Sequence, residues 1–200
     1  MEVFVSLAAL ITAVAAVVIT LEQTKVMREE ADLERKNARI SVMPSVWVST
    51  YIDTADGEAY FRVALTNKGL GPAVIERFDV TYHGQPVYSW DELARKMAAR
   101  IGSEKSFEED FLTSSRSPVS PGLMLEAGAM SYPIQVEEGS DRDGTKLFFR
   151  GSQDMSISVC FCSLHGDCFR TELFLRPQEV DACEPADKPF VSHVFVRDQG

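Results

Sequence analysis

The sequence predicts a mainly β fold, in which an N-terminal transmembrane helix and a helical stalk precede an antiparallel β-sandwich with one inserted helix. Residues 3–21 carry no charged side chain, and residues 22–39 are rich in charged, helix-forming side chains. From residue 40 onward, short runs of alternating apolar and polar residues are separated by turns that contain glycine or proline. We therefore divide the chain into a transmembrane helix at 1–21, a juxtamembrane helical stalk at 22–39 and a β-sandwich domain at 40–200.

Composition and charge exclude several classes of protein. The 200 residues are 45% hydrophobic and 25% charged, unlike disordered, collagen-like or disulfide-packed chains. The formal net charge is −10. A negatively charged chain repels a polyanion. Phosphate binding also needs clustered lysine and arginine side chains. We therefore expect no nucleic-acid partner.

The apolar segment is long enough to cross a bilayer. A helix of residues 3–21 is about 28 Å long, close to the roughly 30 Å hydrocarbon core. A cleaved signal peptide is the alternative, since Ala13-Val14-Ala15 resembles a cleavage site. Signal peptides begin with basic residues, and the segment from Met1 to Phe4 contains none. We expect an uncleaved, single-pass anchor.

Basic residues beside the apolar segment predict its orientation. None precedes it, and five follow it within the stalk: Lys25, Arg28, Arg35, Lys36 and Arg39. The positive-inside rule then places the N-terminus outside and the C-terminal domain in the cytoplasm. We expect the anchor to lie in the inner (cytoplasmic) membrane.

Two patterns predict self-association. Small residues recur at every fourth position of the span: Ala8, Thr12, Ala16 and Thr20. This spacing lets two membrane helices approach closely. Val26 and Leu33 of the stalk and Ile40 directly after it lie seven residues apart, which is typical of a coiled coil over two heptads. We expect a helical stalk, with a short parallel coiled coil in an oligomer as the alternative.

The remainder of the chain has the pattern of short strands around one helix. Strands are expected at 40–44, 46–50, 61–66, 74–81, 123–126, 132–136, 146–150, 155–162, 168–176 and 190–196. A helix is expected near 89–102, because Ser89 and Glu92 form a capping box and Gly102 ends the apolar stripe. The polar, acidic segment near 103–120 contains two prolines and is expected to be a mobile loop.

Two segments carry a resemblance to a known fold family. Asn67-x-Gly69-x-Gly71-Pro72-Ala73 lies between two alternating strands, and Ser120-Pro121-Gly122-Leu123-x-Leu125-x-Ala127-Gly128 precedes a later one. These runs resemble bacterial immunoglobulin-like sandwich domains. The chain also resembles small bacterial single-pass membrane proteins that carry such a domain at the C-terminus. The resemblance extends from Phe61 to Val136; it implies a fold and an anchor, and it carries over no catalytic residue.

The best candidate for chemistry is the segment from Cys160 to Cys168, which also contains Cys162 and His165. A five-residue turn in this segment would set Cys162 opposite Cys168 and Cys160 opposite Arg170, on the outer face of a hairpin. The same alternation places Phe161 and Phe169 in the core.

Three interpretations of these cysteines stay open. The cysteines are a reduced, structurally neutral pair, or they form a disulfide in an exported body, or they bind a metal ion together with His165. The reduced pair is our expectation, because cytoplasmic thiols stay reduced.

Other polar residues form no recognisable catalytic pattern. His83 and His193 have no serine or acid at the spacing of a triad. Gly69-x-Gly71 lacks the lysine and the helix of a phosphate-binding loop. An acidic run is typical of a solvated loop: Glu104, Glu108, Glu109 and Asp110. We therefore assign no catalytic, cofactor-binding or metal-binding residue and expect no cofactor.

These observations predict a non-enzymatic, membrane-anchored binding or scaffolding module that presents its β-sandwich to the cytoplasm. Its partners would be the lipid bilayer and either another protein or a second copy of the chain, which would associate through the transmembrane helix. Two alternatives stay open. One is a ligand- or partner-triggered membrane effector or switch, for example in bacterial defence. The other is a metal- or thiol-dependent enzyme centred on Cys160–Cys168.

Overall fold

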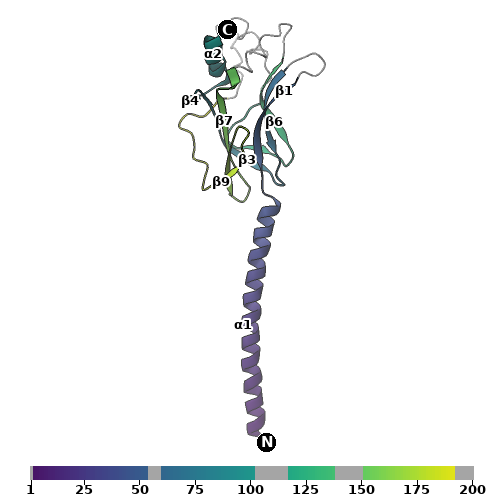
Figure 1. The fold of residues 1–200 in the computed structure, drawn as a ribbon. Coiled ribbons are helices and arrows are strands. Elements are labelled where there is room, and N and C mark those ends of the chain that lie inside the picture. Colours follow the sequence, from purple (N-terminus) through teal and green to yellow (C-terminus); the bar gives the residue numbers. More distant parts are fainter. Residues whose placement is uncertain (1, 54–59, 102–116, 138–150, 192–200) are drawn as a thin grey trace, which may run out of the picture. The chain divides into compact units, whose positions relative to one another are not determined.

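The computed structural model describes residues 2–53, 60–101, 117–137 and 151–191. Contacts divide the chain into two units, residues 1–41 and residues 42–200. The first unit is a helix, and the second is a body built of antiparallel strands (Figure 1). The fold is therefore mainly β, with a helix at the N-terminus.

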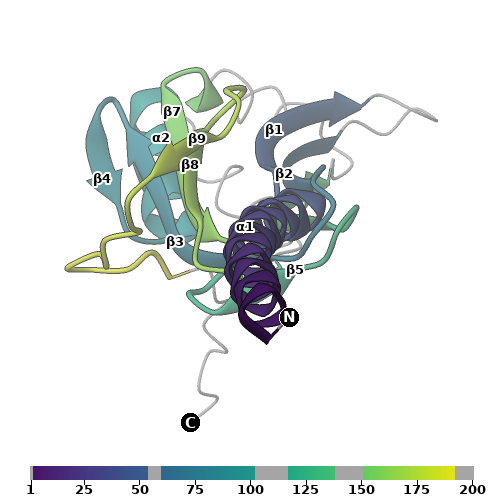
Figure 2. The ribbon, with the colours of Figure 1, turned by 90° about the horizontal axis from the view of Figure 1, so that it is seen from below.

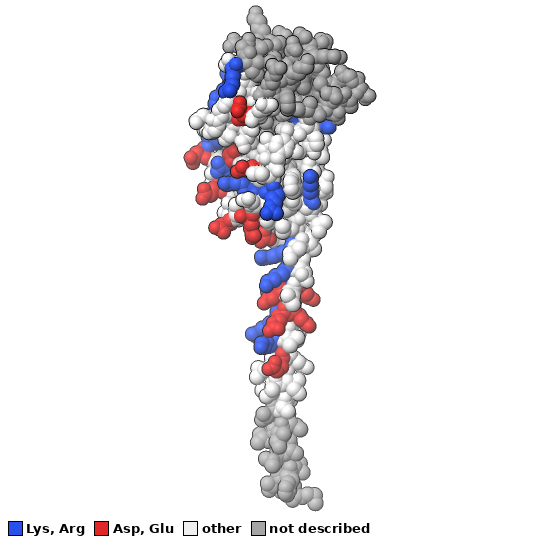
Figure 3. All heavy atoms as spheres, in the orientation of Figure 1, with Lys and Arg blue, Asp and Glu red and all other residues white. Residues whose placement is uncertain are grey.

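Helix α1 runs from Glu2 to Ser41 without a break. At 1.5 Å per residue it is about 60 Å long. The apolar segment and the charged stalk of the sequence are thus parts of one helix, and Figure 3 shows the charged side chains gathered on its stalk segment. The strand expected at 40–44 is wrong, because Ile40 and Ser41 still belong to the helix and the first strand begins only at Val46.

The side chains of residues 1–12 and Val14 lie outside the described part of the chain, and most of the predicted transmembrane helix is therefore not covered by it. Within the described part, no helix is both long enough and apolar enough to cross a membrane. The large apolar side chains that are described on α1 are exposed: Val17, Val18, Ile19, Leu21, Val26, Met27, Leu33 and Ile40. The membrane anchor stays a prediction.

The first sheet contains three antiparallel strands in the order β1-β2-β6. They are β1 (Val46–Asp53), β2 (Tyr60–Asn67) and β6 (Met130–Glu137). β1 and β2 pair along their whole length. The register of β2 against β6 shifts between Val63 and Leu65, and a shift of this kind bends a strand and increases its twist.

The second sheet has the order β4-β3-β7-β8-β9, and β5 also pairs with β3. Its strands are β3 (Ala73–Tyr82), β4 (Gln85–Val87), β5 (Leu123–Leu125), β7 (Met155–Cys162), β8 (Cys168–Glu172) and β9 (Gln178–Val180). All these pairings are antiparallel. The short strands β4 and β9 were not expected, and β8 ends before the expected residue 176. Figures 1 and 2 show the two sheets as separate layers of the body.

A single apolar core contains residues from both sheets. Phe61 and Val63 of β2 belong to it, together with Ile157, Val159 and Phe161 of β7. Each of these side chains alternates in sequence with a neighbour on the opposite face of its strand. Burial of a side chain of this size stabilises the fold by about 1.5–3 kcal/mol. The core therefore determines which face of β7 is turned outward.

Helix α2 (Trp90–Ile101) packs its apolar stripe into the same core, and Trp90, Leu93 and Met97 are almost completely buried. The expected helix near 89–102 is confirmed over these residues. Residue 102, at which we expected the helix to end, lies outside the described residues.

The N-terminal cap of α2 takes a modified form. The Glu92 backbone N–H donates a hydrogen bond to Ser89 Oγ at 3.1 Å, as the capping box predicts. In return, Glu92 Oε2 accepts the N–H of Tyr88 at 3.0 Å instead of the N–H of Ser89. This backbone hydrogen bond is the main cause of a lowered pKa of Glu92, with a smaller contribution from Lys96.

A buried asparagine holds the turn between β2 and β3. Asn67 has no solvent exposure. Its Oδ1 accepts the backbone N–H groups of Ser45 and Gly69, each at 3.0 Å. Its Nδ2 donates to the carbonyl oxygens of Gly71 at 2.8 Å and Leu125 at 3.0 Å. One side chain thus ties together the turn itself, the approach to β1 and the strand β5.

The two glycines of this turn allow the backbone to pass closely. A Cβ atom on Gly71 would overlap the backbone carbonyl of Val42, and one on Gly69 would lie 2.5 Å from the carbonyl oxygen of Met43. The spacing Asn67-x-Gly69-x-Gly71 therefore serves the packing of this turn.

Three expected features lie wholly or largely outside the described residues: the strand at 146–150, the late strand at 190–196 and the mobile loop near 103–120. Parts of two of them are described. Val119 is buried in the core, and Val191 forms an isolated parallel bridge with Ser89.

Candidate functional site

The expected register of the cysteine hairpin is confirmed. Cys162 lies opposite Cys168, and Cys160 lies opposite Arg170. On its other side, Cys160 lies opposite Arg77 of β3. Directly opposed residues of neighbouring antiparallel strands share a face of the sheet. Cys160 therefore lies in a row between two arginines.

The inner side and the tip of the hairpin are also well defined. Phe161 and Phe169 are buried and stack with their ring centroids 5.6 Å apart, as the alternation predicted. At the tip, Ser163 Oγ accepts the N–H groups of His165 at 3.1 Å and Asp167 at 3.2 Å. These bonds close the five-residue turn that sets the register of the cysteines.

All four cysteines are paired in disulfides. Cys160 is bonded to Cys183, and Cys162 is bonded to Cys168. No described cysteine is free. The expectation of a reduced, structurally neutral pair is therefore wrong for this structure. Sequence reasoning missed Cys183 because this residue follows β9, where no alternation indicates a strand; the even number of cysteines was the available signal.

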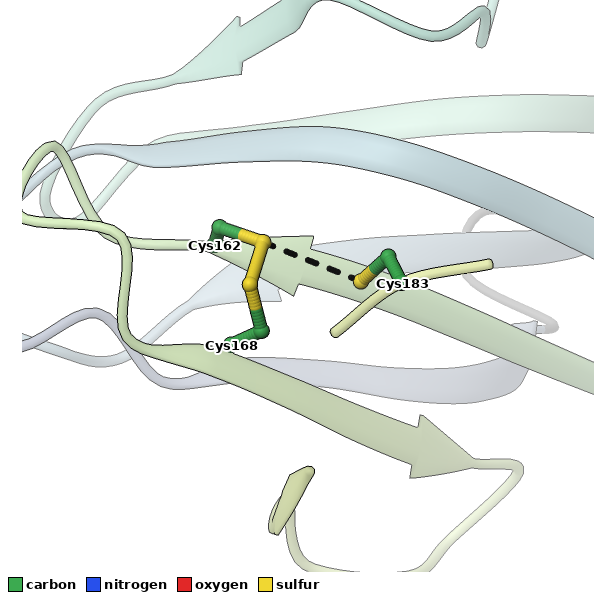
Figure 4. Close-up of side chains that lie close together, drawn as sticks. All are labelled: Cys162, Cys168 and Cys183. Atoms are coloured by element: carbon green, nitrogen blue, oxygen red, sulfur yellow. Dashed lines mark hydrogen bonds between the residues drawn. A yellow bond between two sulfur atoms is a disulfide. The ribbon is translucent and has the colours of Figure 1, made fainter. Parts of the chain in front are cut away.

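The two disulfides are in contact. Cys162 Sγ lies 3.8 Å from Cys183 Sγ, and the dashed line in Figure 4 joins these two sulfurs. Each of these sulfurs is bonded to another sulfur and carries no hydrogen. The contact is therefore a van der Waals contact between two disulfides and not a hydrogen bond.

The metal-binding interpretation acquires a different set of residues. The Sγ atoms of Cys162, Cys168 and Cys183 lie within 4.8 Å of one another. This group includes Cys183, which was not among the expected ligands, and it does not include His165. A metal ion needs thiolate sulfurs, which these residues could offer after reduction of both disulfides.

The segment Asp181–Val191, which we call the strap, is held on the outer face of the second sheet. Its first attachment is the disulfide from Cys183 to Cys160. Its second is the hydrogen bond that Arg77 Nη1 donates to the carbonyl oxygen of Glu184 at 3.2 Å. Both attachments lie on the row of residues that runs across β3 and β7.

The far end of the strap is held by aromatic contacts. The Phe190 ring lies 5.3 Å from Phe78 and 5.0 Å from Trp90, measured between ring centroids. Lys188 Nζ lies 4.0 Å from the centroid of the Tyr88 ring, a distance at which a cation–π interaction forms. The strap is thus fixed at both ends.

A groove of about 370 Å³ lies between the strap and the sheet. Its charged lining residues are Arg77, Arg170 and Lys188 with Asp79 and Glu184. Arg77 Nε and Asp79 Oδ2 form an ion pair at 2.6 Å, while Arg170 is exposed. Positive groups thus outnumber negative ones in the groove of a chain whose formal net charge is −10.

The other candidate residues lie elsewhere. His83 contacts Arg100 and lies 3.4 Å from Asp154, measured from Nε2 to Oδ2. Next to it, burial raises the pKa of Tyr82. His193 and the acidic run lie outside the described residues, the latter being Glu104, Glu108, Glu109 and Asp110. Among the described residues, His83 and its neighbours are separate from the cysteine hairpin.

Comparison with known protein families, with curated proteins and with solved structures gives no match for this chain. The cysteine hairpin, the strap and the groove therefore have to be interpreted from their own chemistry.

Proposed function

We propose that this chain is a membrane-anchored, non-enzymatic binding module. Helix α1 contains the anchor and the stalk, and the two antiparallel sheets form an immunoglobulin-like sandwich that presents a binding surface. The groove under the strap is the site of binding.

The observation that carries the proposal is the continuity of α1. The helix joins the uncharged residues 3–21 to the charged stalk and ends at Ser41, five residues before the first strand at Val46. An apolar segment of this length without charges has the sequence of a membrane span.

The groove suits a binding function because it combines several charged groups with aromatic surface. Its charged side chains come from β3, β8 and the strap, and Tyr88 and Phe190 add aromatic surface. Sites for small ligands commonly combine a concave apolar surface with a few placed polar groups. The excess of cationic side chains favours a ligand that carries an anionic group.

The anchor is tested with the full chain in bacterial membranes. Ala13→Arg puts a charge into the middle of the apolar segment, at a cost of about 2.5–3.5 kcal/mol for insertion. We expect this variant to leave the fraction that resists alkaline extraction. Ala31→Arg, the same substitution in the stalk, should leave the distribution unchanged. A wild-type chain that is extracted like a soluble protein would contradict the proposal.

Two observations favour opposite locations of the body relative to the membrane. The five basic residues of the stalk favour a cytoplasmic body. The two disulfides favour an oxidising compartment, because cytoplasmic thiols are kept reduced. Fusions at the C-terminus to a reporter active in the periplasm and to one active in the cytoplasm distinguish them, since one of the two enzymes should be active.

A further inference from the structure

We propose that the four cysteines form a thiol–disulfide relay that moves the attachment of the strap from Cys160 to Cys162. A dithiol, either a small molecule or a protein of the disulfide-exchange class, opens the Cys162–Cys168 bond. The freed Cys162 then attacks Cys183. This activity goes beyond the proposed binding function, because it makes the shape of the groove depend on the redox state of a partner.

The contact between the two disulfides provides the path for this exchange. Cys162 Sγ already lies 3.8 Å from Cys183 Sγ, so the attacking atom needs to move by about the difference between van der Waals contact and a bond. Thiol–disulfide exchange proceeds by attack of a thiolate on a disulfide sulfur. Cys162 is thus in place as a nucleophile once its bond to Cys168 is open.

The relay begins at the hairpin pair. Cys162 and Cys168 are the last pair of residues before the exposed tip, which includes Leu164 and His165. Cys160 at 2% exposed and Cys168 at 9% are both buried, while Cys162 and Cys183 are both partly exposed. The two disulfides are thus similarly buried, and we place the first attack at the hairpin pair because it borders the exposed tip.

The surroundings of Cys160 make it a good leaving group. Arg77 on β3 and Arg170 on β8 lie directly opposite Cys160 in the two registers. Arg77 is paired with Asp79, so stabilisation of a Cys160 thiolate would depend mainly on the guanidinium group of Arg170, and a more stable thiolate leaves faster. The exchange therefore has a direction, from the hairpin pair toward release of Cys160.

The atoms and electrons balance in two steps. In the first, the dithiol is oxidised to its own disulfide, and two electrons and two protons go to Cys162 and Cys168. In the second, Cys162 loses its proton to solvent, its sulfur bonds to Cys183 Sγ, and the bond from Cys183 to Cys160 breaks. Cys160 leaves as a thiolate and takes up a proton. The second step needs no further electrons.

The product changes the groove. Cys160 and Cys162 are two residues apart on β7, which corresponds to about 7 Å along the strand. Because Cys183 Sγ already lies 3.8 Å from Cys162 Sγ, the strap near Cys183 would shift toward the tip of the hairpin by less than this spacing. The hydrogen bond from Arg77 to the Glu184 carbonyl oxygen could not then persist with its present geometry. The groove that Glu184 and Lys188 line would change shape.

The test maps disulfides in the purified full chain after treatment with one equivalent of dithiothreitol, acid quenching and alkylation. We expect alkylation at Cys160 and Cys168 and a new link between Cys162 and Cys183. Alkylation at Cys162 and Cys168 with the strap disulfide intact would overturn the proposal, as would first reduction of the Cys160–Cys183 bond. A chain that carries four free thiols before treatment would also overturn it.

A pair of arginine variants tests the directing role of the cationic row without touching a cysteine. Arg170→Gln should reduce the ratio of the relayed form to the unrelayed form about fivefold, which corresponds to an electrostatic interaction of roughly 1 kcal/mol. Arg176→Gln, an exposed arginine beyond the end of β8, should leave this ratio unchanged. Equal effects of the two substitutions would refute the role of Arg170.

Discussion

Replacement of Asn67 by alanine tests whether one side chain holds the turn between β2 and β3 to the rest of the body. The substitution removes the amide donor from the carbonyl oxygens of Gly71 and Leu125, in a buried place. It also removes the acceptor from the N–H groups of Ser45 and Gly69, in partly buried places. Four hydrogen bonds are lost with one amide group.

The expected loss is a large part of the total stability. A hydrogen bond contributes a net 0.5–1.5 kcal/mol or so, and a buried group left without a partner costs about 1–3 kcal/mol. We therefore expect the free energy of unfolding to fall by about 4–5 kcal/mol, out of the roughly 5–15 kcal/mol typical of a domain. For a body of this size, the midpoint of thermal unfolding should fall by about 10–20 °C.

Thermal unfolding of the full chain in detergent measures this loss, and Thr66→Val is the matched control. Thr66 is the neighbour of Asn67 on β2, and its Oγ1 is buried without a hydrogen-bond partner among the described residues. Removal of this hydroxyl by an isosteric side chain should be nearly neutral. The reasoning is refuted if Asn67→Ala lies within about 1 kcal/mol of Thr66→Val.

Three further predictions concern other parts of the body. Gly71→Ala should abolish accumulation of folded chain, because the added methyl group overlaps a backbone carbonyl, whereas Gly166→Ala, at φ +85 with open space around it, should cost about 1–2 kcal/mol in a thermal melt. Folding lowers the pKa of Glu92, so the stability that its carboxylate contributes is present above the ordinary pKa of 4.5 and is lost as the pH falls through the lower pKa of the folded state. Glu92→Gln should therefore reduce the loss of stability at acid pH, measured by thermal melts at a series of pH values. Cys183→Ser opens a link between residues 23 apart and should cost about 3 kcal/mol, and Cys168→Ser opens a link between residues 6 apart and should cost about 2 kcal/mol; the reverse order in chemical denaturation would contradict the loop-length argument.

The register of β7 and β8 was predictable because it depends on local features of the sequence. Alternation sets which residues point inward, and the length of the turn sets which residues face each other. Cys162 therefore had to lie opposite Cys168 as soon as Ser163–Asp167 was taken as the turn. The capping of α2 by Ser89 was predictable for the same reason, since the cap and the capped N–H are three residues apart.

The parts that were missed are those in which the sequence pattern is short, absent or ambiguous. β4 and β9 are three residues long, and too few positions alternate in them to indicate a strand. The strap has no periodic pattern, so the sequence does not show that Cys183 returns to Cys160. Ile40 and Ser41 were assigned to a strand because an alternating run begins there, but the helix that precedes them continues through both residues.

The redox state of the compartment determines whether the groove is formed in advance. In the oxidised chain, the strap is held at Cys183 by a covalent bond and at Phe190 by two aromatic neighbours. After reduction, the attachment near Cys183 that remains among the described residues is the hydrogen bond from Arg77 to the Glu184 carbonyl oxygen, and an exposed bond of this kind contributes about 1 kcal/mol. Ordering the backbone of a single residue costs about 1–2 kcal/mol, so this bond is too weak to keep the first half of the strap in place. An oxidising compartment would therefore give a preformed groove, and a reducing one would make the ligand order the strap as it binds.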